Sequence, residues 1–408
     1  MLLRLPLRPI SIAQRPPYLF PVPSAFRRSI HQHHQRSPLR PAFLPCLRLR
    51  NPTPLKRHLH LPAILVPPLV FTGLFLILWV YKCAMMIVFQ NRIIYMPSMP
   101  PGARREKIED YAGMCGGVRW TEKRIRARDG VELGLCVGES ANSGRLKAAD
   151  TAERHVVILY FQGNASSLPP RLPLLSGVLK DLERGGSDPR VKYTFVALSY
   201  RGYWTSRGRA SQKGIELDAL AALDWIHEEY LEDLDGSTLR RDHGDTIVLW
   251  GQSIGAGVAT GLAAHQCETK SNRRTSVGGL ILETPFLSVQ SMLVALYPQR
   301  WLPYRYLWPF LRNWWDSEAA LKRTGVALQE AERELERGSE RKMRVLIVSA
   351  ANDELVPGQQ ADRLEEICVE SGLDVQRRRV AGALHTDATV RAEGRNAVVR
   401  FLKEVGER

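Results

Sequence analysis

The pattern of apolar and polar positions changes character at about Trp120. Beyond it, short and nearly continuous apolar runs alternate with longer amphipathic stretches, the pattern of parallel strands joined by helices. The runs that predict strands are 155–161, 193–200, 246–250, 279–282 and 343–349. Few polar residues interrupt them, as expected for strands buried on both faces of a sheet. The sequence therefore predicts an α/β domain with a mostly parallel central sheet flanked by helices.

Three further stretches of this domain have a clear pattern. Residues 211–230 predict a helix, because Leu217, Leu220 and Ala221 recur on one side of it. Residues 138–154 and 321–342 are polar and charged. We predict a loop for the first of these and an exposed helical insertion for the second.

One long uncharged stretch precedes the domain. Residues 61–81 carry no charged side chain, and prolines at 62, 67 and 68 predict a helix that begins late, with Pro68 near its first turn. A helix over 69–88 has a length of about 30 Å, enough to cross the hydrocarbon core of a bilayer. A buried core helix is the alternative, but this length favours a transmembrane anchor within 61–90.

The first sixty residues are strongly basic, with eleven Lys and Arg and no Asp or Glu. Subtracting these eleven from the net charge of +15 leaves only +4 for the rest of the chain. Residues 1–60 are rich in Arg, Pro and Ser without helical or strand periodicity, which predicts a disordered tail. The excess of positive charge before the anchor favours a cytoplasmic tail and a domain on the other side of the membrane.

The composition of the tail bears on the organelle. It is rich in Arg and free of acids, like an organellar transit peptide, but its prolines disfavour an amphipathic helix. We expect a single-pass protein of the endoplasmic reticulum membrane, with a mitochondrial membrane as the alternative. Nucleic-acid binding is not expected, because prolines rather than stacking aromatics interrupt the charges.

The six cysteines lie far apart, and no two form a C-x-x-C pair. This spacing predicts neither a zinc knuckle nor a thioredoxin-like site. We expect unpaired, mostly buried thiols. One disulfide among Cys115, Cys136, Cys267 and Cys368 is the alternative, if the domain lies in an oxidising lumen.

The clearest candidate for chemistry is a serine between two glycines. Residues 251–255 read Gly-Gln-Ser-Ile-Gly, directly after the predicted strand 246–250 and directly before a helix-like stretch. A serine at such a strand–turn–helix junction takes a strained backbone conformation, and larger flanking residues would clash with the strand and the helix. This context predicts Ser253 as a nucleophile.

An acid and a base are expected later in the chain, each in a loop after a strand. Asp353 comes just after a predicted strand, and His385 follows a short predicted strand at 375–380. In a Ser-His-Asp triad the histidine takes the serine proton, and the carboxylate fixes the tautomer of the histidine. We therefore predict Ser253, Asp353 and His385 as the catalytic residues, and expect Glu354 to point away from the imidazole.

An oxyanion hole requires two backbone N–H groups aimed at one point. The N–H of Ile254 is the first candidate, because this residue follows the nucleophile. The second is expected in the loop after the predicted strand 155–161. We assign it to Asn164, with Ala165 as the alternative.

Several motifs resemble those of one family, in the same order along the chain. They are 161–165 (Phe-Gln-Gly-Asn-Ala), 200–203 (Tyr-Arg-Gly-Tyr), 251–255, 353–357 (Asp-Glu-Leu-Val-Pro) and 382–387, and they are similar to those of the membrane-anchored α/β-hydrolase domain proteins numbered 12 and 13 and their relatives. The resemblance covers residues 90–405. Three positions depart from it: Gln162 replaces the usual His, Ser199 the usual Asp and Trp204 the common Gly. We expect Gln162 to affect the support of the oxyanion loop and Trp204 the mouth of the pocket.

The resemblance implies an α/β-hydrolase fold over residues 91–408, preceded by one transmembrane helix. It also implies hydrolysis of acyl esters, of lipids such as monoacylglycerols or lysophospholipids, with no cofactor and no metal. Residues 284–342 would then be a cap and its insertion. The cap holds four of the nine tryptophans, Trp301, Trp308, Trp314 and Trp315. Its aromatics would either receive an acyl chain from the bilayer or pack the cap against the core.

Two other kinds of function remain open. A thioesterase or a peptidase would use the same triad, because these enzymes share acyl transfer. A catalytically inert membrane scaffold is the alternative of another class, which Gln162 and Trp204 support and the intact triad opposes. The predicted partners are a lipid or acyl-ester substrate and the membrane bilayer; no protein partner is indicated.

Overall fold

The computed structural model describes residues 62–139, 154–184, 188, 190–231, 245–269, 277–334 and 343–407. The chain divides into two compact units, Met1–Leu61 and Pro62–Arg408. The predicted disordered tail 1–60 lies outside the described residues, and so does most of the predicted loop 138–154. The second unit holds every element of the described fold.

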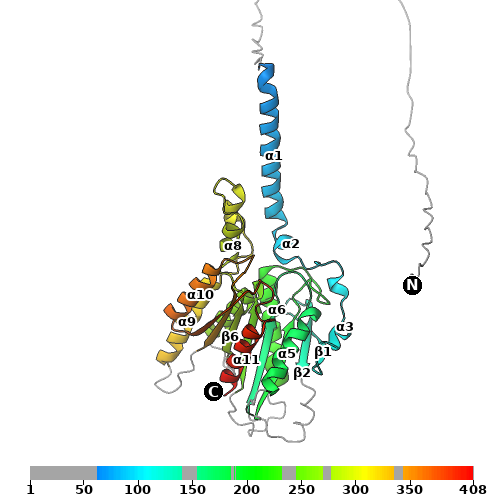
Figure 1. Ribbon diagram of the computed structural model, residues 1–408, viewed down its shortest axis with the longest axis vertical. Helices are drawn as coiled ribbons and strands as arrows, with labels where there is room; N and C mark the ends of the chain where they lie inside the picture. Colours follow the sequence, from blue (N-terminus) through cyan, green and yellow to red (C-terminus); the bar gives the residue numbers. More distant parts are fainter. Residues whose placement is uncertain are drawn as a thin grey trace, which may run out of the picture. The chain divides into compact units, whose positions relative to one another are not determined.

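An eight-stranded sheet, in the order β1-β2-β4-β3-β5-β6-β7-β8, forms the centre of this unit. Figure 1 shows the sheet with helices packed around it. The strands are β1 (Arg119–Arg126), β2 (Glu132–Glu139), β3 (Arg154–Phe161), β4 (Val191–Leu198), β5 (Thr246–Gln252), β6 (Val277–Glu283), β7 (Arg344–Ala350) and β8 (Asp374–Val380). From β4 to β8 the neighbouring strands pair in parallel, whereas β1 pairs with β2, and β2 with β4, in antiparallel fashion. The predicted mostly parallel sheet is confirmed.

The six predicted strands correspond to β3–β8, and the two antiparallel strands were not predicted. β1 lies at the edge of the sheet and is charged, with Trp120 and Ile125 as its buried residues. An edge strand with one partner needs no continuous apolar run, so its sequence resembles that of a loop.

Helices cover both faces of the sheet. One cluster of buried side chains joins the sheet to α5 (Leu172–Arg184) and α11 (Ala392–Gly406). A second cluster, on the other face, joins it to α6 (Gln212–Ile226), α7 (Ile254–Glu268), α9 (Ser317–Glu334) and α10 (Gly358–Glu370). This is the two-sided helical covering predicted from the alternating pattern.

For the described part of 321–342 the predicted helix is confirmed, but the predicted exposure is wrong. Residues 321–334 belong to α9, whose Leu321 and Thr324 are fully buried. A Cβ on Gly325 would lie 2.5 Å from the carbonyl oxygen of Ser371, so α9 lies close against the segment after α10. Its polar residues occupy the solvent side of an amphipathic helix in the sheet covering.

The apolar stretch before the domain forms α1 (Val66–Val88), which follows a short 3-10 helix, η1 (Ala63–Leu65). The helix begins three residues earlier than predicted, because Pro67 and Pro68 occupy its first turn, where backbone N–H groups have no partner within the helix. Ala63–Val88 is long and apolar enough to cross a membrane, and none of it is buried in the protein. A short helix, α2 (Gln90–Tyr95), follows directly.

Between β6 and α9, in the segment that we call the cap because a cap is predicted there, the elements are short. They are α8 (Val289–Leu296) and the 3-10 helices η5 (Pro303–Tyr306) and η6 (Trp308–Phe310). The remaining short elements are η2 (Ala103–Arg105), α3 (Glu109–Ala112), η3 (Pro169–Arg171) and a π-helical turn, η4 (His227–Leu231).

The five cysteines in the described ranges are all unpaired: Cys83, Cys115, Cys136, Cys267 and Cys368.

Candidate active site

Ser253 lies at a sharp turn between β5 and α7. Its φ of 52° and ψ of −116° lie outside the common regions, at a cost of about 1–3 kcal/mol. A Cβ on Gly251 would lie 2.1 Å from the carbonyl oxygen of Gly255, and one on Gly255 would lie 2.2 Å from that of Phe161. Only glycine fits at these two positions, which is the geometry of the predicted nucleophile elbow.

The neighbouring strand holds this turn in place. The N–H of Ser253 donates to the carbonyl oxygen of Glu283, at the end of β6, over 2.8 Å. The carbonyl oxygen of Ser253 accepts the N–H of Ala256 over 2.9 Å, which starts α7. The backbone N–H of Ser253 is therefore satisfied by the neighbouring strand, and its carbonyl oxygen by the first turn of α7.

His385 and Asp353 form a close, buried pair. Nδ1 of His385 lies 2.9 Å from Oδ2 of Asp353, and the two side chains are 5% and 6% exposed. Oδ1 of Asp353 also accepts the backbone N–H groups of Leu355 and Val356. Burial acts to raise the pKa of Asp353, but these hydrogen bonds outweigh it and lower the pKa below its ordinary value. The ionised carboxylate orients the imidazole through Nδ1 and leaves Nε2 for another partner.

The parallel strands bring the predicted site residues to one edge of the sheet. Asn164 follows β3, Ser253 follows β5, Asp353 follows β7 and His385 follows β8. Asn164, Ser253, Ile254 and His385 line one cavity of about 360 Å³. Asp353 is joined to this cavity through its bond to His385. All five predicted site residues therefore lie together.

The rest of the cavity lining is apolar apart from Gln90 and Tyr297. The end of α1 and the residues after it contribute Met86, Ile87, Gln90, Ile93, Ile94 and Met96. The cap contributes Phe286, Val289, Met292, Leu293, Leu296, Tyr297, Leu307, Phe310 and Leu311, and the loop after β7 contributes Leu355 and Val356. The cavity thus joins the predicted anchor, the cap and the catalytic candidates.

The loop after β3 distinguishes between the two candidates for the second oxyanion donor. The N–H of Ala165 donates to the carbonyl oxygen of Tyr95 over 2.9 Å and is therefore occupied. The N–H groups of Asn164 and Ile254 make no hydrogen bond within the described ranges. This arrangement favours Asn164 over Ala165, as the sequence predicted.

Tyr95, at the end of α2, supports the site and was not predicted. Its carbonyl oxygen also accepts the hydroxyl of Tyr203, and its own hydroxyl donates to Asn313 and accepts from Nε1 of Trp315, over 2.9 Å in both cases. It therefore ties the oxyanion loop to the cap. No local sequence signal reveals such a residue, because its partners lie far away in the chain.

Glu283 is a second unpredicted residue, fully buried at the end of β6. Oε1 accepts the hydroxyl of Thr389 over 2.6 Å and Oε2 accepts Nε1 of Trp250 over 3.1 Å. Burial raises the pKa of this carboxyl, although Arg171 and the hydrogen bonds oppose the rise. Through its side chain and its carbonyl oxygen, Glu283 connects the Ser253 turn with the segment that follows His385.

Gln162 departs from the resembled motif and lies directly before the oxyanion loop. Its side chain is buried, and neither amide atom has a hydrogen-bond partner among the described residues. Its carbonyl oxygen accepts the hydroxyl of Tyr200 over 2.8 Å. Its predicted effect on the support of the loop stays a prediction.

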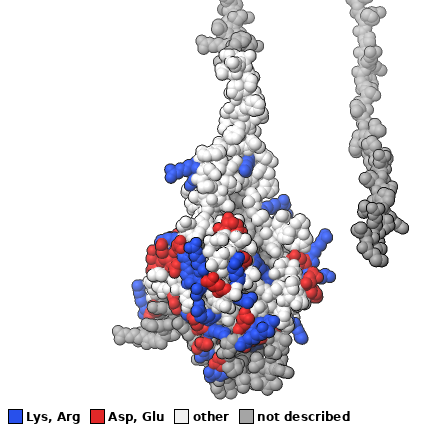
Figure 2. Space-filling model, viewed as in Figure 1, with Lys and Arg blue, Asp and Glu red and all other residues white. Residues whose placement is uncertain are grey.

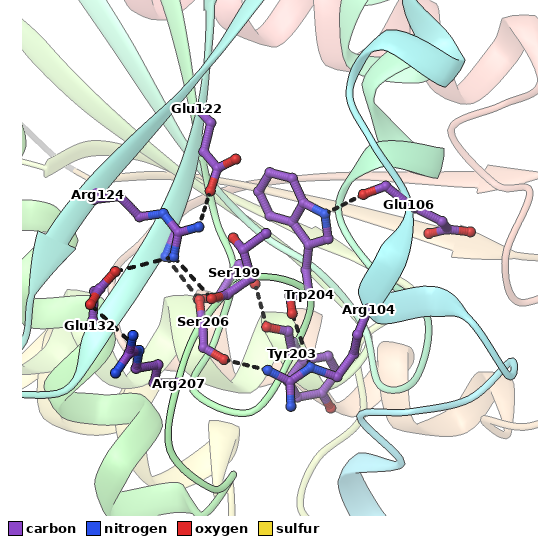
Figure 3. Close-up of polar contacts among 12 residues, drawn as sticks. Arg104, Glu106, Glu122, Arg124, Glu132, Ser199, Tyr203, Trp204, Ser206 and Arg207 are labelled. Atoms are coloured by element: carbon purple, nitrogen blue, oxygen red, sulfur yellow. Dashed lines mark hydrogen bonds and ion pairs between the residues drawn. The ribbon is translucent and has the colours of Figure 1, made fainter.

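Trp204 does not lie at the pocket mouth, which corrects the expectation from the sequence. It is 2% exposed and outside the cavity lining. Its Nε1 donates to the carbonyl oxygen of Glu106 over 2.7 Å, and its own carbonyl oxygen accepts Nε of Arg104 over 3.0 Å (Figure 3). Its φ of 35° is left-handed, a conformation that glycine adopts freely, which accounts for the glycine common at this position in the resembled group.

Ser199, the third departure, takes part in the same polar cluster. Its carbonyl oxygen accepts the hydroxyl of Ser206 over 2.7 Å, and its own hydroxyl donates to the carbonyl oxygen of Tyr203 over 3.3 Å (Figure 3). The residue is fully buried and does not line the cavity. It therefore supports the loop after β4.

Several known proteins are similar to this chain in sequence. No protein-family model matches the chain. Over 274 residues it is 29% identical to the alpha/beta hydrolase domain-containing protein WAV2 of Arabidopsis thaliana, which covers 67% of this chain and 74% of WAV2. Over 148 residues it is 33% identical to the lysophosphatidylserine lipase ABHD12 of Mus musculus, which covers 34% of this chain and 29% of ABHD12.

A solved structure shares the fold. The crystal structure of an alpha-beta hydrolase from Vibrio vulnificus superposes with a TM-score of 0.50 at 17% identity, over 78% of this chain and 91% of that one. This likeness shows the fold alone, whereas the similarity in sequence to WAV2 and ABHD12 indicates common descent. The chain therefore has the α/β-hydrolase fold and belongs to the α/β-hydrolase superfamily, with ABHD12-like proteins among its homologues.

Proposed function

We propose that this chain is a serine hydrolase that cleaves acyl esters of single-chain lipids, such as monoacylglycerols or lysophospholipids. The observation that carries the proposal is the cavity in which Ser253 and His385 meet an otherwise almost wholly apolar lining. A few polar groups at the wall of an apolar cavity suit a substrate whose ester adjoins a long hydrocarbon chain.

The proposed mechanism is acyl transfer through a covalent intermediate. Ser253 Oγ attacks the ester carbonyl while Nε2 of His385 takes its proton and then passes it to the leaving alcohol. Asp353 keeps the imidazole in the required tautomer and stabilises the imidazolium that forms. The N–H groups of Ile254 and Asn164 stabilise the oxyanion. Water then attacks the acyl-enzyme, with His385 again as the base, and no cofactor is required.

Two observations support a lipid as the substrate. The relative ABHD12 carries the name of a lysophosphatidylserine lipase, although the chain matches only 29% of its length. In addition, the end of α1 and the residues of α2 form part of the cavity wall. We propose that α1 crosses a membrane of the endoplasmic reticulum or of the mitochondrion, so that the cavity lies where the anchor leaves the bilayer.

The test uses full-length protein in lipid nanodiscs. A fluorophosphonate probe should label Ser253, and the variant Ser253→Ala should not be labelled. The wild type should then hydrolyse monoacylglycerols or lysophospholipids with long acyl chains more efficiently than it hydrolyses short p-nitrophenyl esters. A folded wild-type protein that neither labels nor hydrolyses any ester would be an inert scaffold, and the proposal would be wrong.

The same assay separates the related chemistries. Acyl thioesters and short peptide amides are tested at matched concentration in the same nanodiscs. A kcat/KM for a thioester or an amide well above that for every lipid ester would favour a thioesterase or a peptidase on the same residues.

A further inference from the structure

The cap carries an exposed apolar surface beside α1. Large side chains within residues 296–310 face the solvent: Leu296 is 58% exposed, Trp301 68%, Tyr306 53%, Trp308 42% and Phe310 56%. So many large apolar side chains within one short segment are unusual on a surface that faces water and mark a binding surface. We call this segment, residues 296–310, the cap tip.

The charge around the cap tip has one sign. Residues 284–315 contain no Asp or Glu, and neither do residues 62–105. The cap tip itself carries Arg300 and Arg305. Around α1 and the cap tip, Figure 2 shows uncharged and basic side chains but no acidic ones, which gather over the body around the sheet. Protein segments at a membrane interface typically contain Trp, Tyr and Arg and lack Asp and Glu.

Hydrogen bonds fasten the cap to the end of α1. The guanidinium of Arg312 donates to the carbonyl oxygens of Ile87 and Val88, over 3.0 Å each. The side chain of Gln90 donates to the carbonyl oxygen of Phe310 over 3.0 Å and accepts the N–H of Arg312 over 2.7 Å. Because the last carbonyl groups of a helix have no partner within it, Arg312 supplies what the helix end lacks. The position of the cap along α1 is therefore set.

Further along α1, the cap tip touches residues of the apolar span itself. The rings of Trp301 and Trp79 lie 5.9 Å apart, and the ammonium group of Lys82 lies 4.5 Å from the ring of Tyr304. Trp79 precedes Val88 by nine residues, so Trp301 lies about 14 Å from the end of α1, measured along the helix toward its start.

This contact determines the depth of the cap tip if α1 spans a bilayer. The apolar helix Ala63–Val88 has 26 residues, and the hydrocarbon core of a bilayer takes about 20 of them. Every stretch of that length within Ala63–Val88 includes Trp79. Trp301 must then lie at the level of hydrocarbon or at its boundary, where a soluble protein partner cannot reach it.

We infer that the cap tip is a second membrane-binding surface, which enters the same leaflet that α1 crosses. Trp301 and Trp308 lie among acyl chains, and Arg300 and Arg305 extend to the headgroups. The inference rests on the proposed function in one respect, that α1 spans a membrane. Leu296 and Phe310 belong both to the cap tip and to the cavity lining. An acyl chain can therefore pass from the leaflet into the cavity without crossing water.

The experiment is photolabelling of the full-length chain in liposomes that contain a lipid with a diazirine on its acyl chain. After illumination, trypsin releases two peptides that together cover most of the cap tip, 301–305 and 306–312. The matched control is the peptide 364–377, which contains the apolar Val369, 64% exposed on α10. We expect lipid adducts on α1 and on both cap peptides and few on the control peptide.

A variant tests the surface without touching the site. Trp301 does not line the cavity, so Trp301→Glu should lower adduct formation on the cap peptides several-fold and leave fluorophosphonate labelling of Ser253 unchanged. Adducts on α1 but not on the cap peptides would overturn the inference and leave the anchor intact. If neither α1 nor the cap peptides carried adducts, α1 would not span the bilayer. The proposed membrane anchor and the inference about the cap tip would then both be wrong.

Discussion

The carboxylate of Glu354 accepts the backbone N–H of His385, with Oε2 2.9 Å from the nitrogen. Its neighbour Asp353 binds the same residue through Nδ1 of the ring. Two consecutive carboxylates therefore hold His385, one by its backbone and one by its imidazole. The sequence indicated only the second contact.

The two carboxylates should differ strongly in their effect on catalysis. Glu354 is exposed, and replacing its carboxylate by an amide that can still accept the same N–H costs about 0.5–1.5 kcal/mol. Glu354→Gln should therefore lower kcat less than about 10-fold. Asp353→Asn should lower it about 10⁴-fold, because the wrong tautomer of His385 results. Ester hydrolysis by the two variants decides the matter, and equal losses would mean that Asp353 is not the triad acid.

Ser253 and His385 should act as one unit. Ser253→Ala or His385→Ala should each lower kcat by about 10⁴–10⁶, and the double variant little more, because either change removes the same activated nucleophile. The measurement is p-nitrophenyl ester hydrolysis over several acyl lengths. Losses that multiply in the double variant would show that the two residues work independently and would contradict the proposed mechanism.

Gly255, two residues after the nucleophile, should tolerate no side chain. A Cβ on Gly255 meets backbone atoms of Phe161 and Gln162, which cannot move aside, so Gly255→Ala should destabilise the protein by at least about 1–3 kcal/mol. Gly261 is the matched control, because it lies in the same helix with no described atom near a Cβ. Gly261→Ala should stabilise by about 0.5–1 kcal/mol. Thermal unfolding of the two full-length variants in detergent tests both signs, and similar effects would refute the steric argument.

Glu283 should make the stability depend on pH. Burial raises the folded-state pKa of its carboxyl above the ordinary value of 4.5, so the folded protein binds this proton more tightly than the unfolded chain does. The stabilisation is complete below pH 4.5 and is lost as the pH rises through the folded-state pKa. The variant Glu283→Gln cannot bind this proton, so its stability lacks this dependence on pH.

The comparison of wild type and Glu283→Gln checks the sign. The Tm of the wild type minus that of the variant should fall as the pH rises from acid toward neutral. The loss of one acceptor for Trp250 in the variant adds an offset that does not depend on pH. A difference that grows with pH would mean that the folded protein holds Glu283 with a lowered pKa.

Trp204 should matter for stability rather than for substrate choice. Trp204→Gly relieves a left-handed φ, worth about 1–3 kcal/mol, but removes a buried indole, which costs about 3–5 kcal/mol. The variant should unfold at lower temperature and keep the preference of the wild type for acyl length. A changed acyl preference with unchanged Tm would mean that Trp204 does lie at the pocket mouth.

Local pattern was sufficient for the central strands and for the candidate triad. A strand buried on both faces needs a continuous apolar run, so β3, β5, β6 and β7 are visible in the chain itself. The turn at Ser253 needs small neighbours, and the sequence shows Gly251 and Gly255. Because parallel strands end at one edge of a sheet, the order of strands and polar residues already implied that Asp353 and His385 would approach it.

Contacts between distant segments were decided only by the tertiary structure. The resemblance placed Trp204 at a pocket mouth, and the polar sequence of 321–334 suits an exposed insertion. Only their packing partners make Trp204 and the inner side of α9 buried. Glu283, Tyr95 and Arg312 act through partners 33 to 225 residues away, a separation over which no periodicity carries information. The contact between α1 and the cap depends on how the whole chain folds, since the sequence of each segment alone shows only that it is apolar and basic.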